Sequence, residues 1–285
     1  MTCPNRAARI GRNPAMENLR KILRVGTSGF SFPDWARTFY RGIPRDMWLK
    51  YYVSLFDSLE LNTTFYAIPP AERIEGIVRQ LPENFSLTVK VPKAITHDRP
   101  RGAQFEVIRR KFAGSILPAR ESPAFEGLLF QFPVGFVRTP HNIDYVRRIL
   151  DSFEGKKFLE FRHRSWRCDE VLSLLEEYGA GWVIPDVPDI PELTGPEPVF
   201  LGGEAYIRLH GRNRQNWYGS SGDRYDYLYS DGEIDWVIDL AKSLVGRGAR
   251  RVFVFFNNCH GGKAAHNALK MLEKLGLYTP PSSLL

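Results

Sequence analysis

The chain has 285 residues, of which 43% are hydrophobic and 25% are charged, and its formal net charge is +7. This composition excludes disordered and fibrous proteins, and the length suffices for one α/β barrel or for two smaller domains. The three cysteines lie far apart without metal-ligand spacing, so neither a disulfide framework nor a structural zinc site is indicated. No apolar run approaches the roughly 20 residues that span a bilayer. We therefore expect a cytoplasmic protein without a membrane partner.

Most of the positive charge lies in the first 24 residues, which carry six basic residues and one acidic residue. The rest of the chain is nearly neutral, which does not favour a nucleic-acid partner. We expect residues 1–22 to form a disordered basic extension. A start at Met16, a targeting segment and a DNA-contacting arm are the alternatives.

From residue 23 onward, strand-like and helix-like segments alternate, which predicts parallel strands joined by helical crossovers. The expected strands are Arg24–Thr27, Leu59–Asn62, Ser86–Val91, Gly127–Phe132, Lys157–Arg162, Trp182–Pro185, Ala205–His210 and Arg251–Phe256. The expected helices cover residues 45–59, 74–81, 105–112, 142–153, 169–178, 230–246 and 263–275.

Two of these helices have specific signals. Apolar side chains recur at helical spacing from Trp48 to Leu59 and form one stripe that is typical of a buried helix face. Ser230 stands three residues before Glu233, which is the pattern of a capping box at a helix start.

The alternation breaks between the sixth and seventh strands. Residues 185–204 contain five prolines, so we expect an irregular connection in place of a helix. Eight strands with about seven helices predict a single TIM-type (β/α)8 barrel over residues 23–285. A doubly wound open sheet has the same local alternation, but no GxGxxG motif follows the first strand.

Polar residues fall two apart in four of the expected strands. The pairs are Glu60 with Asn62, Thr88 with Lys90, Glu160 with Arg162, and Arg208 with His210. Because alternate side chains of a strand point to opposite faces, each pair shares one face and apolar residues occupy the other. This pattern predicts a barrel whose polar interior carries the chemistry.

Several motifs occur in order along nearly the whole chain from Val25. They are Gly26–Phe30 with Trp35 and Phe39–Tyr40, Glu60–Tyr66, Lys90 with Ile95–His97, Leu129–Pro133, Glu160–His163 with Ser165–Trp166, Tyr206–Gly211, and Phe256–Asn258 with Asn267–Leu269. Together they resemble the YecE-like proteins, family 72 of the domains of unknown function. The resemblance implies a TIM-barrel-like fold but no established activity. The chain departs from the family pattern at Cys259–Lys263, where relatives usually carry acidic residues.

Reacting groups in such barrels lie at the carboxyl ends of the strands. The expected catalytic residues are Glu60, Glu160, His210 and Lys90. The expected substrate-binding residues are Ser28, Asn62, Tyr66, Gln131, Arg162, Trp166, Asp186, Arg208, Asn257, Asn258 and Lys263.

The residue types suggest a division of roles. Glu60 and Glu160 suit proton transfer, with His210 as a further proton carrier because its ordinary pKa is about 6.5. Lys90 can polarise an oxygen.

The arginines and the end of the chain point to an anion. Arg162 and Arg208 present planar donors for a carboxylate or phosphate. His260–Lys263 precedes a helix, where backbone N–H groups favour a phosphate, although two glycines there also suit an ordinary turn. Loop aromatics such as Trp166 and Tyr66 suit stacking on a sugar or base, or packing on the barrel.

These features favour an enzyme that acts on a small anionic, phosphorylated or sugar-containing substrate. One alternative is a metal-assisted phosphoesterase resembling endonuclease-IV-like barrels, with Glu60, Glu160, Asp186 and His210 as ligands. Another is a non-catalytic nucleic-acid-binding module. The acidic and basic groups can also neutralise one another in a purely structural network. The sequence predicts no particular cofactor, reaction or oligomeric state.

Overall fold

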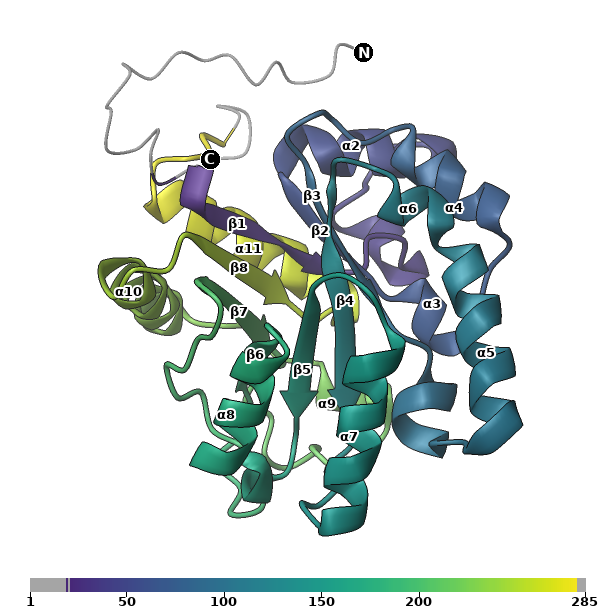
Figure 1. Cartoon of the computed structure of the whole chain (residues 1–285). Coiled ribbons are helices and arrows are strands. Elements are labelled where there is room, and N and C mark those ends of the chain that lie inside the picture. Colours follow the sequence, from purple (N-terminus) through teal and green to yellow (C-terminus); the bar gives the residue numbers. More distant parts are fainter. Residues whose placement is uncertain (1–18, 20, 281–285) are drawn as a thin grey trace.

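Eight parallel strands close into a barrel in which each strand pairs with the next and the last pairs with the first (Figure 1). The computed structural model describes Leu19 and residues 21–280. The strands are β1 Leu23–Ser28, β2 Ser58–Leu61, β3 Ser86–Lys90, β4 Phe125–Phe132, β5 Lys157–Phe161, β6 Gly181–Asp186, β7 Glu204–Leu209 and β8 Arg251–Phe256. Each overlaps an expected strand, so the predicted (β/α)8 barrel is confirmed and the open sheet is wrong.

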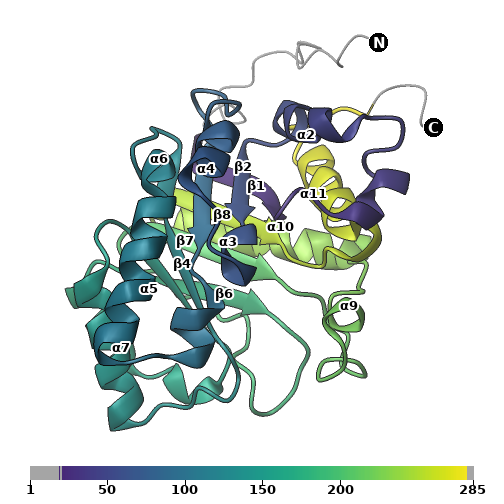
Figure 2. The same cartoon turned by 90° about the vertical axis from the view of Figure 1, so that its right-hand side faces the viewer.

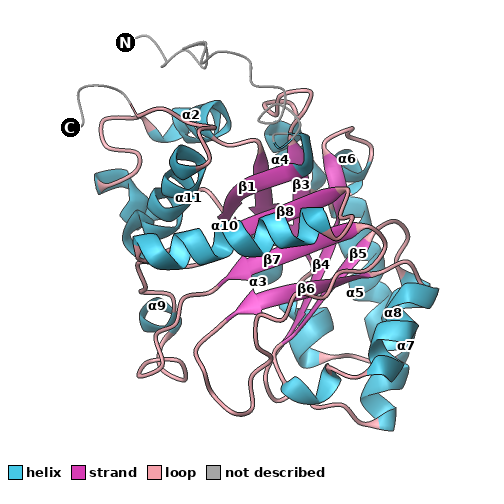
Figure 3. Ribbon diagram, turned by 90° about the vertical axis from the view of Figure 1, so that its left-hand side faces the viewer, coloured by secondary structure: helices cyan, strands magenta, loops and turns pink. Residues whose placement is uncertain are grey.

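Helices surround the barrel. The longer ones are α2 Trp48–Leu55, α4 Ala71–Val78, α5 Gly102–Ser115, α7 Pro140–Ser152, α8 Asp169–Glu177, α10 Asp231–Gly246 and α11 Lys263–Lys274. Shorter elements are η1 Pro33–Arg37, η2 Arg45–Met47, α3 Thr63–Tyr66, η3 Ala94–Asp98, α6 Leu117–Arg120, η4 Arg164–Trp166, α9 Ser221–Arg224 and η5 His260–Gly262. Helices α4, α5 and α6 cover the side of β3 and β4 (Figure 2), and α10 crosses the outside of β7 and β8 (Figure 3).

The first expected helix is shorter than its apolar stripe suggested. Helix α2 ends at Leu55, because Phe56 is extended and Leu59 already belongs to β2, where it pairs with Thr27. The hydroxyl group of Tyr52 accepts a hydrogen bond from the backbone N of Thr27 and donates one to the carbonyl of Ser58. This contact fastens the end of the helix to the first two strands. The capping box at Ser230 is present as expected.

The connection between β6 and β7 contains no helix over residues 187–203. Its side chains Val187 and Leu193 pack with Trp217 from the loop after β7. The backbone N of Thr194 donates to the carbonyl of Arg162, and Leu193 forms an isolated bridge with His163. The proline-rich segment therefore lies alongside the carboxyl end of β5 and forms one wall of the barrel opening.

The expected basic extension over residues 1–22 lies mostly outside the described residues. Of that segment, Leu19 and Ile22 pack against the main hydrophobic core. Within the described part of the chain, no helix combines the length and apolar character that crossing a bilayer requires.

Closure of the barrel between β1 and β2 depends on a residue without a side chain. A Cβ atom at Gly26 would lie 2.2 Å from the backbone oxygen of Ser58. Gly26→Ala should therefore lower the free energy of unfolding by about 1–3 kcal/mol through overpacking. Gly114→Ala is the matched control, since nothing lies within 4 Å of that Cβ position in α5.

The control should raise stability by up to about 1 kcal/mol, because alanine favours a helix over glycine. Urea unfolding measures both effects. Equal stability of the two variants would show that the barrel tolerates a wider separation of β1 and β2.

Candidate active site

Alternation along the strands sends one row of polar side chains into the carboxyl-terminal half of the barrel. The lower lumen is filled by the apolar cluster Leu129, Phe158, Val183, Tyr206, Phe253 and Phe255. Above this floor, the inward positions carry the buried residues Glu60, Thr88, Lys90, Gln131, Glu160, Arg162, Arg208 and His210. The structure therefore gathers all four expected catalytic residues at the mouth of the barrel.

Arg208 lies at the centre of this layer between two carboxylates. Its Nε and Nη2 atoms donate to the two carboxylate oxygens of Glu60 at 2.8 and 2.7 Å, and Nη1 donates to Glu160. The side chains of all three residues are 0% exposed. Nη2 also lies 3.4 Å from the hydroxyl oxygen of Ser28. Ion pairs thus connect β2, β5 and β7 across the interior.

Tyr206 supports Glu60 from below. Its hydroxyl donates to Glu60 Oε2 at 2.7 Å and lies 2.9 Å from the hydroxyl oxygen of Thr88. Burial and the carboxylate of Glu60 raise the pKa of Tyr206 well above its ordinary value of 10, so it remains a neutral donor. Tyr206 was not among the expected site residues, although its place two residues before Arg208 puts it on the inward face.

A second group of contacts lies around the end of β5. Arg162 Nε donates to Glu160, and Nη2 lies 3.2 Å from His210 Nδ1. Asn257 donates its side-chain amide to His210 Nδ1 at 2.8 Å. The guanidinium carbon of Arg162 is 5.4 Å from the ring centre of Trp217. Trp217, which packs on the proline-rich segment, thereby covers the guanidinium group of Arg162.

His210 is neutral in this environment. Since Nδ1 accepts from Asn257, we place the ring proton on Nε2, which lies 3.2 Å from Glu160 Oε1. Burial and the charge of Arg162 lower the pKa of His210 well below 6.5, against the opposing effect of Glu160. The ordinary value on which its expected role as proton carrier relied therefore does not apply here.

Glu160 is ionised. Burial alone raises the pKa of a carboxyl group, but Arg162, Arg208 and His210 outweigh burial and hold the pKa of Glu160 well below 4.5. Its oxygens bond all three of these residues.

Lys90 is the cation of the mouth that lacks an acidic partner. Its Nζ donates to Gln131 Oε1 at 3.1 Å and lies 3.9 Å from the ring centre of Phe65. Among the described residues, no carboxylate lies within 4.0 Å of Nζ. Burial, Arg208 and Arg162 lower the pKa of Lys90 to about 7, although Glu60 and Glu160 oppose the shift.

His97 follows β3 and contacts the ring of Phe65. It lies near the same positive charges as Lys90. Burial, Lys90 and Arg162 lower the pKa of His97 to about 4. Sequence analysis named neither His97 nor Phe65 among the site residues. Both stand in the quoted motifs, but nothing in their spacing shows that α3 and η3 bring them to Lys90.

Asp186 does not join this group. On β6, Val183 points into the barrel and Ile184 points outward. Asp186 lies two residues after Ile184, so it also points outward, toward the surrounding helices. Its carboxylate accepts from Arg212 at 3.0 Å and from Tyr229 at 2.6 Å. Burial raises the pKa of Asp186 despite these two donors.

The four ligands that the phosphoesterase alternative requires are therefore not assembled. Asp186 faces outward, while the oxygens of Glu60 and Glu160 bond guanidinium groups. Across the described part of the chain, no group of three or more His, Cys, Asp or Glu side chains is arranged to hold a metal ion.

Three other expected binding residues have contacts away from the mouth. Asn258 donates to the carbonyl of Tyr227 and to the side chain of Asn267, so it joins the last loop to α11. Trp166 is 0% exposed and stacks on Phe161. Lys263 pairs with Asp226 near the surface. Each of these three residues contacts elements outside the barrel interior.

Asn62 and Tyr66 follow Glu60 on the loop side of β2. The Asn62 Oδ1 atom is buried and has no hydrogen-bond partner among the described residues. Tyr66 is 74% exposed and ends α3, the short helix that follows β2. Ser28 contacts Arg208, and Gln131 contacts Lys90.

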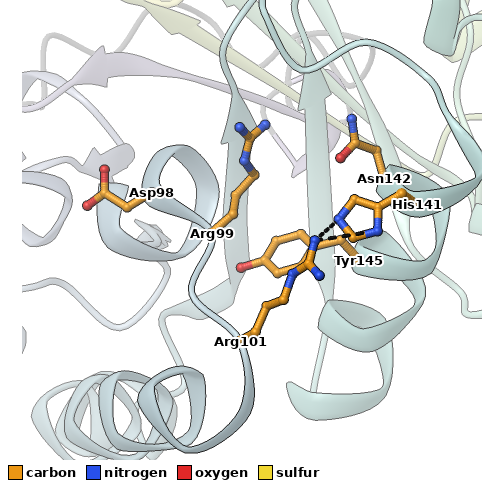
Figure 4. A pocket seen from close by; sticks show the side chains of 6 residues that line it. All are labelled: Asp98, Arg99, Arg101, His141, Asn142 and Tyr145. Atoms are coloured by element: carbon orange, nitrogen blue, oxygen red, sulfur yellow. Dashed lines mark hydrogen bonds between the residues drawn. The ribbon is translucent and has the colours of Figure 1, made fainter.

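A separate pocket of about 220 Å³ lies outside the barrel, between η3 and the start of α7 (Figure 4). Arg101 reaches the ring of His141 there. Asp98 and Arg99 point away from that pair in Figure 4. The polar groups of this pocket do not converge on one point, so we place the candidate active site in the barrel mouth.

Almost all of the chain from β1 onward matches one family. Residues 24–283 match the family described as "Protein of unknown function DUF72". The chain belongs to the DUF72 family. It is 33% identical over 248 residues to UPF0759 protein YunF of Bacillus subtilis, covering 80% of this chain and 86% of that protein. The YecE-like resemblance is thereby confirmed.

Two solved structures of DUF72 family proteins share the fold. The Thermotoga maritima protein has a TM-score of 0.81 and 34% identity, and the match covers 90% of this chain and 99% of that one. The Enterococcus faecalis protein has a TM-score of 0.78 and 29% identity, over 91% of this chain and 97% of that one.

The unpaired state of Lys90 predicts a pH-dependent stability. Because its pKa falls from 10.5 to about 7 on folding, the folded chain binds fewer protons than the unfolded chain between these values. The charged form of buried Lys90 destabilises the folded state fully below pH 7, and this destabilisation disappears as the pH rises to 10.5. Lys90→Met should therefore raise the free energy of unfolding at pH 6 by an amount on the order of a few kcal/mol.

This advantage should shrink as the pH rises from 7 toward 10, which urea unfolding at several pH values measures. Lys111→Met is the control, since Lys111 is exposed on α5. A Lys90→Met effect that is constant with pH, or that destabilises at pH 6, would contradict the environment described for Lys90.

Proposed function

We propose that this protein is an enzyme that binds a small anionic substrate, phosphorylated or sugar-containing, at the carboxyl-terminal mouth of its barrel. The observation that carries the proposal is Lys90, a buried cation without a carboxylate partner beside a network that is already neutral. An anion in the mouth supplies the missing negative charge.

The charges of the network balance without Lys90. Glu60 and Glu160 are bonded by Arg208 and Arg162, so two negative charges meet two positive charges. His210 is neutral. Lys90 adds a positive charge, and burial together with Lys90 and Arg162 lowers the pKa of His97 to about 4. This excess favours phosphate or carboxylate groups over neutral ligands.

Stability alone does not account for so many buried charges. Moving each ion out of water costs several kcal/mol, and apolar side chains of similar volume often stabilise a protein equally well. The lower half of the same lumen is filled in this apolar way by Phe158, Phe253 and their neighbours. The change from apolar to charged residues at the carboxyl end supports a binding role, since substrates of such barrels bind there.

The contacts support a division of roles within the mouth. We assign proton transfer to Lys90, because a pKa of about 7 suits an acid or base at neutral pH. Glu60 and Glu160 act as positioning residues, since all their oxygens are engaged. Arg162 holds the substrate anion with its remaining donor, and His210 supports the guanidinium.

Ligand-induced stabilisation tests the proposal. Inorganic phosphate and a panel of sugar phosphates should raise the Tm of the wild-type protein in a concentration-dependent manner. Arg162→Gln should abolish the rise. Arg138→Gln should retain it, because Arg138 pairs with Glu170 on the surface.

Compounds that raise the Tm are then incubated with the protein, and their conversion is followed by NMR spectroscopy. An equal rise in all three proteins indicates a general salt effect and contradicts the proposal. Stabilisation by DNA alone, with a steep dependence on salt, would favour a nucleic-acid-binding module instead.

A further inference from the structure

We propose that Lys90 forms a covalent imine with the substrate, so that the site takes a small anionic aldehyde or ketone. This inference rests on the proposed function and specifies the substrate class of the same site. It assigns the amine of Lys90 a role as nucleophile in addition to proton transfer.

The position of Lys90 suits a nucleophile. The residue ends β3 and points into the mouth, where 8% of it remains exposed. Its Nζ has a single hydrogen-bond acceptor, Gln131 Oε1, whose amide is itself fixed by a bond to the carbonyl of Phe132. The ring of Phe65 covers one side of the amine. Nζ therefore keeps a defined position. When the amine is neutral, no donor among the described residues bonds to its lone pair.

A second buried lysine shows the contrast. Lys157 lies at the opposite, amino-terminal end of β5 and is equally shielded from solvent. Its Nζ donates to the carbonyl oxygens of Phe153 and Gly155 at 2.7 and 3.1 Å. Burial lowers the pKa of both lysines, but Lys157 has two carbonyl acceptors, whereas Lys90 has a single acceptor and lies near Arg208 and Arg162, which oppose its protonation. Of these two lysines, Lys90 alone combines burial, a lone pair without a donor and a position at the mouth.

The covalent step balances without an added oxidant or reductant. The neutral Nζ attacks the carbonyl carbon and forms a C–N bond. The carbonyl oxygen takes up one proton that Nζ loses and a second proton from solvent, and it leaves as water, which yields the iminium ion. Because this cation withdraws electrons, a C–H bond on the carbon next to the imine carbon becomes more acidic. Hydrolysis of the iminium restores Lys90.

The cations near Lys90 explain why the carbonyl compound is anionic. Arg162 and Arg208 lie close enough to lower the pKa of Lys90. Arg208 is saturated by Glu60 and Glu160, whereas Arg162 Nη1 has no partner among the described residues. A phosphate or carboxylate on Arg162 holds the substrate beside the amine and offsets the positive field as the iminium forms.

Reductive trapping tests the inference. The full-length protein is incubated with glyoxylate, which carries an aldehyde and a carboxylate, and is then reduced with cyanoborohydride. Peptide mapping by mass spectrometry should find carboxymethylation of Lys90 in at least roughly tenfold excess over any other lysine, because far more of its amine is neutral at pH 7. The labelling rate of Lys90 should rise with pH with a midpoint near 7. Lys157 is the internal control and should stay unlabelled.

Matched probes separate the steps. Glycolaldehyde, a neutral aldehyde of similar size, should label Lys90 more slowly than glyoxylate, and inorganic phosphate should protect Lys90 from glyoxylate. Arg162→Gln should remove this difference between the two aldehydes. Lys90→Met should remove the label without a new site of modification.

Labelling in proportion to surface exposure, with Lys90 unmodified, would overturn the inference. If phosphate still raises the Tm through Arg162 in that case, the imine fails while the anion-binding function stands. If phosphate has no effect on Tm either, both fail.

Discussion

The ion pairs of Arg208 with Glu60 and Glu160 set the geometry of the barrel mouth. They connect three strands across the lumen above its apolar floor, and every carboxylate oxygen in them has a partner. The pairing is necessary, because an unpaired charge in the same place costs several kcal/mol. Because Arg208 fixes Glu160, and Glu160 in turn contacts Arg162 and His210, the positions of these two residues depend on the ion pair below them.

Lys90 differs from its neighbours because the network leaves it no counter-ion. The same burial that makes the pairing of Arg208 strong makes an unpaired ammonium unfavourable. The proposed anionic substrate would complete the charge balance around Lys90. The apolar cluster around Phe158 lies below this layer, and Trp217, which packs with Val187 and Leu193, covers Arg162. The proposed binding and the proposed reactivity of Lys90 thus rest on one arrangement of charges.

The sequence predicted the fold well because strand periodicity and helix signals are local. The same period of two residues identified Glu60, Glu160 and Arg208 as inward residues at the strand ends. It could not show which groups pair, since Glu60 and Arg208 are 148 residues apart. Asp186 was expected at the mouth because it follows the predicted strand Trp182–Pro185, whereas β6 continues to Asp186 and places it on the outward face. The role of Phe65 depends on the short helix α3, for which no periodic signal exists.

The stability of variants in which charges of the network are removed singly or together tests the central claim most directly. Arg208→Met leaves two buried carboxylates without their shared cation and should lower the free energy of unfolding by about 3–5 kcal/mol. The double variant Glu60→Gln and Arg208→Met removes one charge of each sign, keeps the pair of Glu160 with Arg162, and should recover most of this loss. A double variant that is as unstable as Arg208→Met, or less stable, would contradict a network held together by mutual charge compensation.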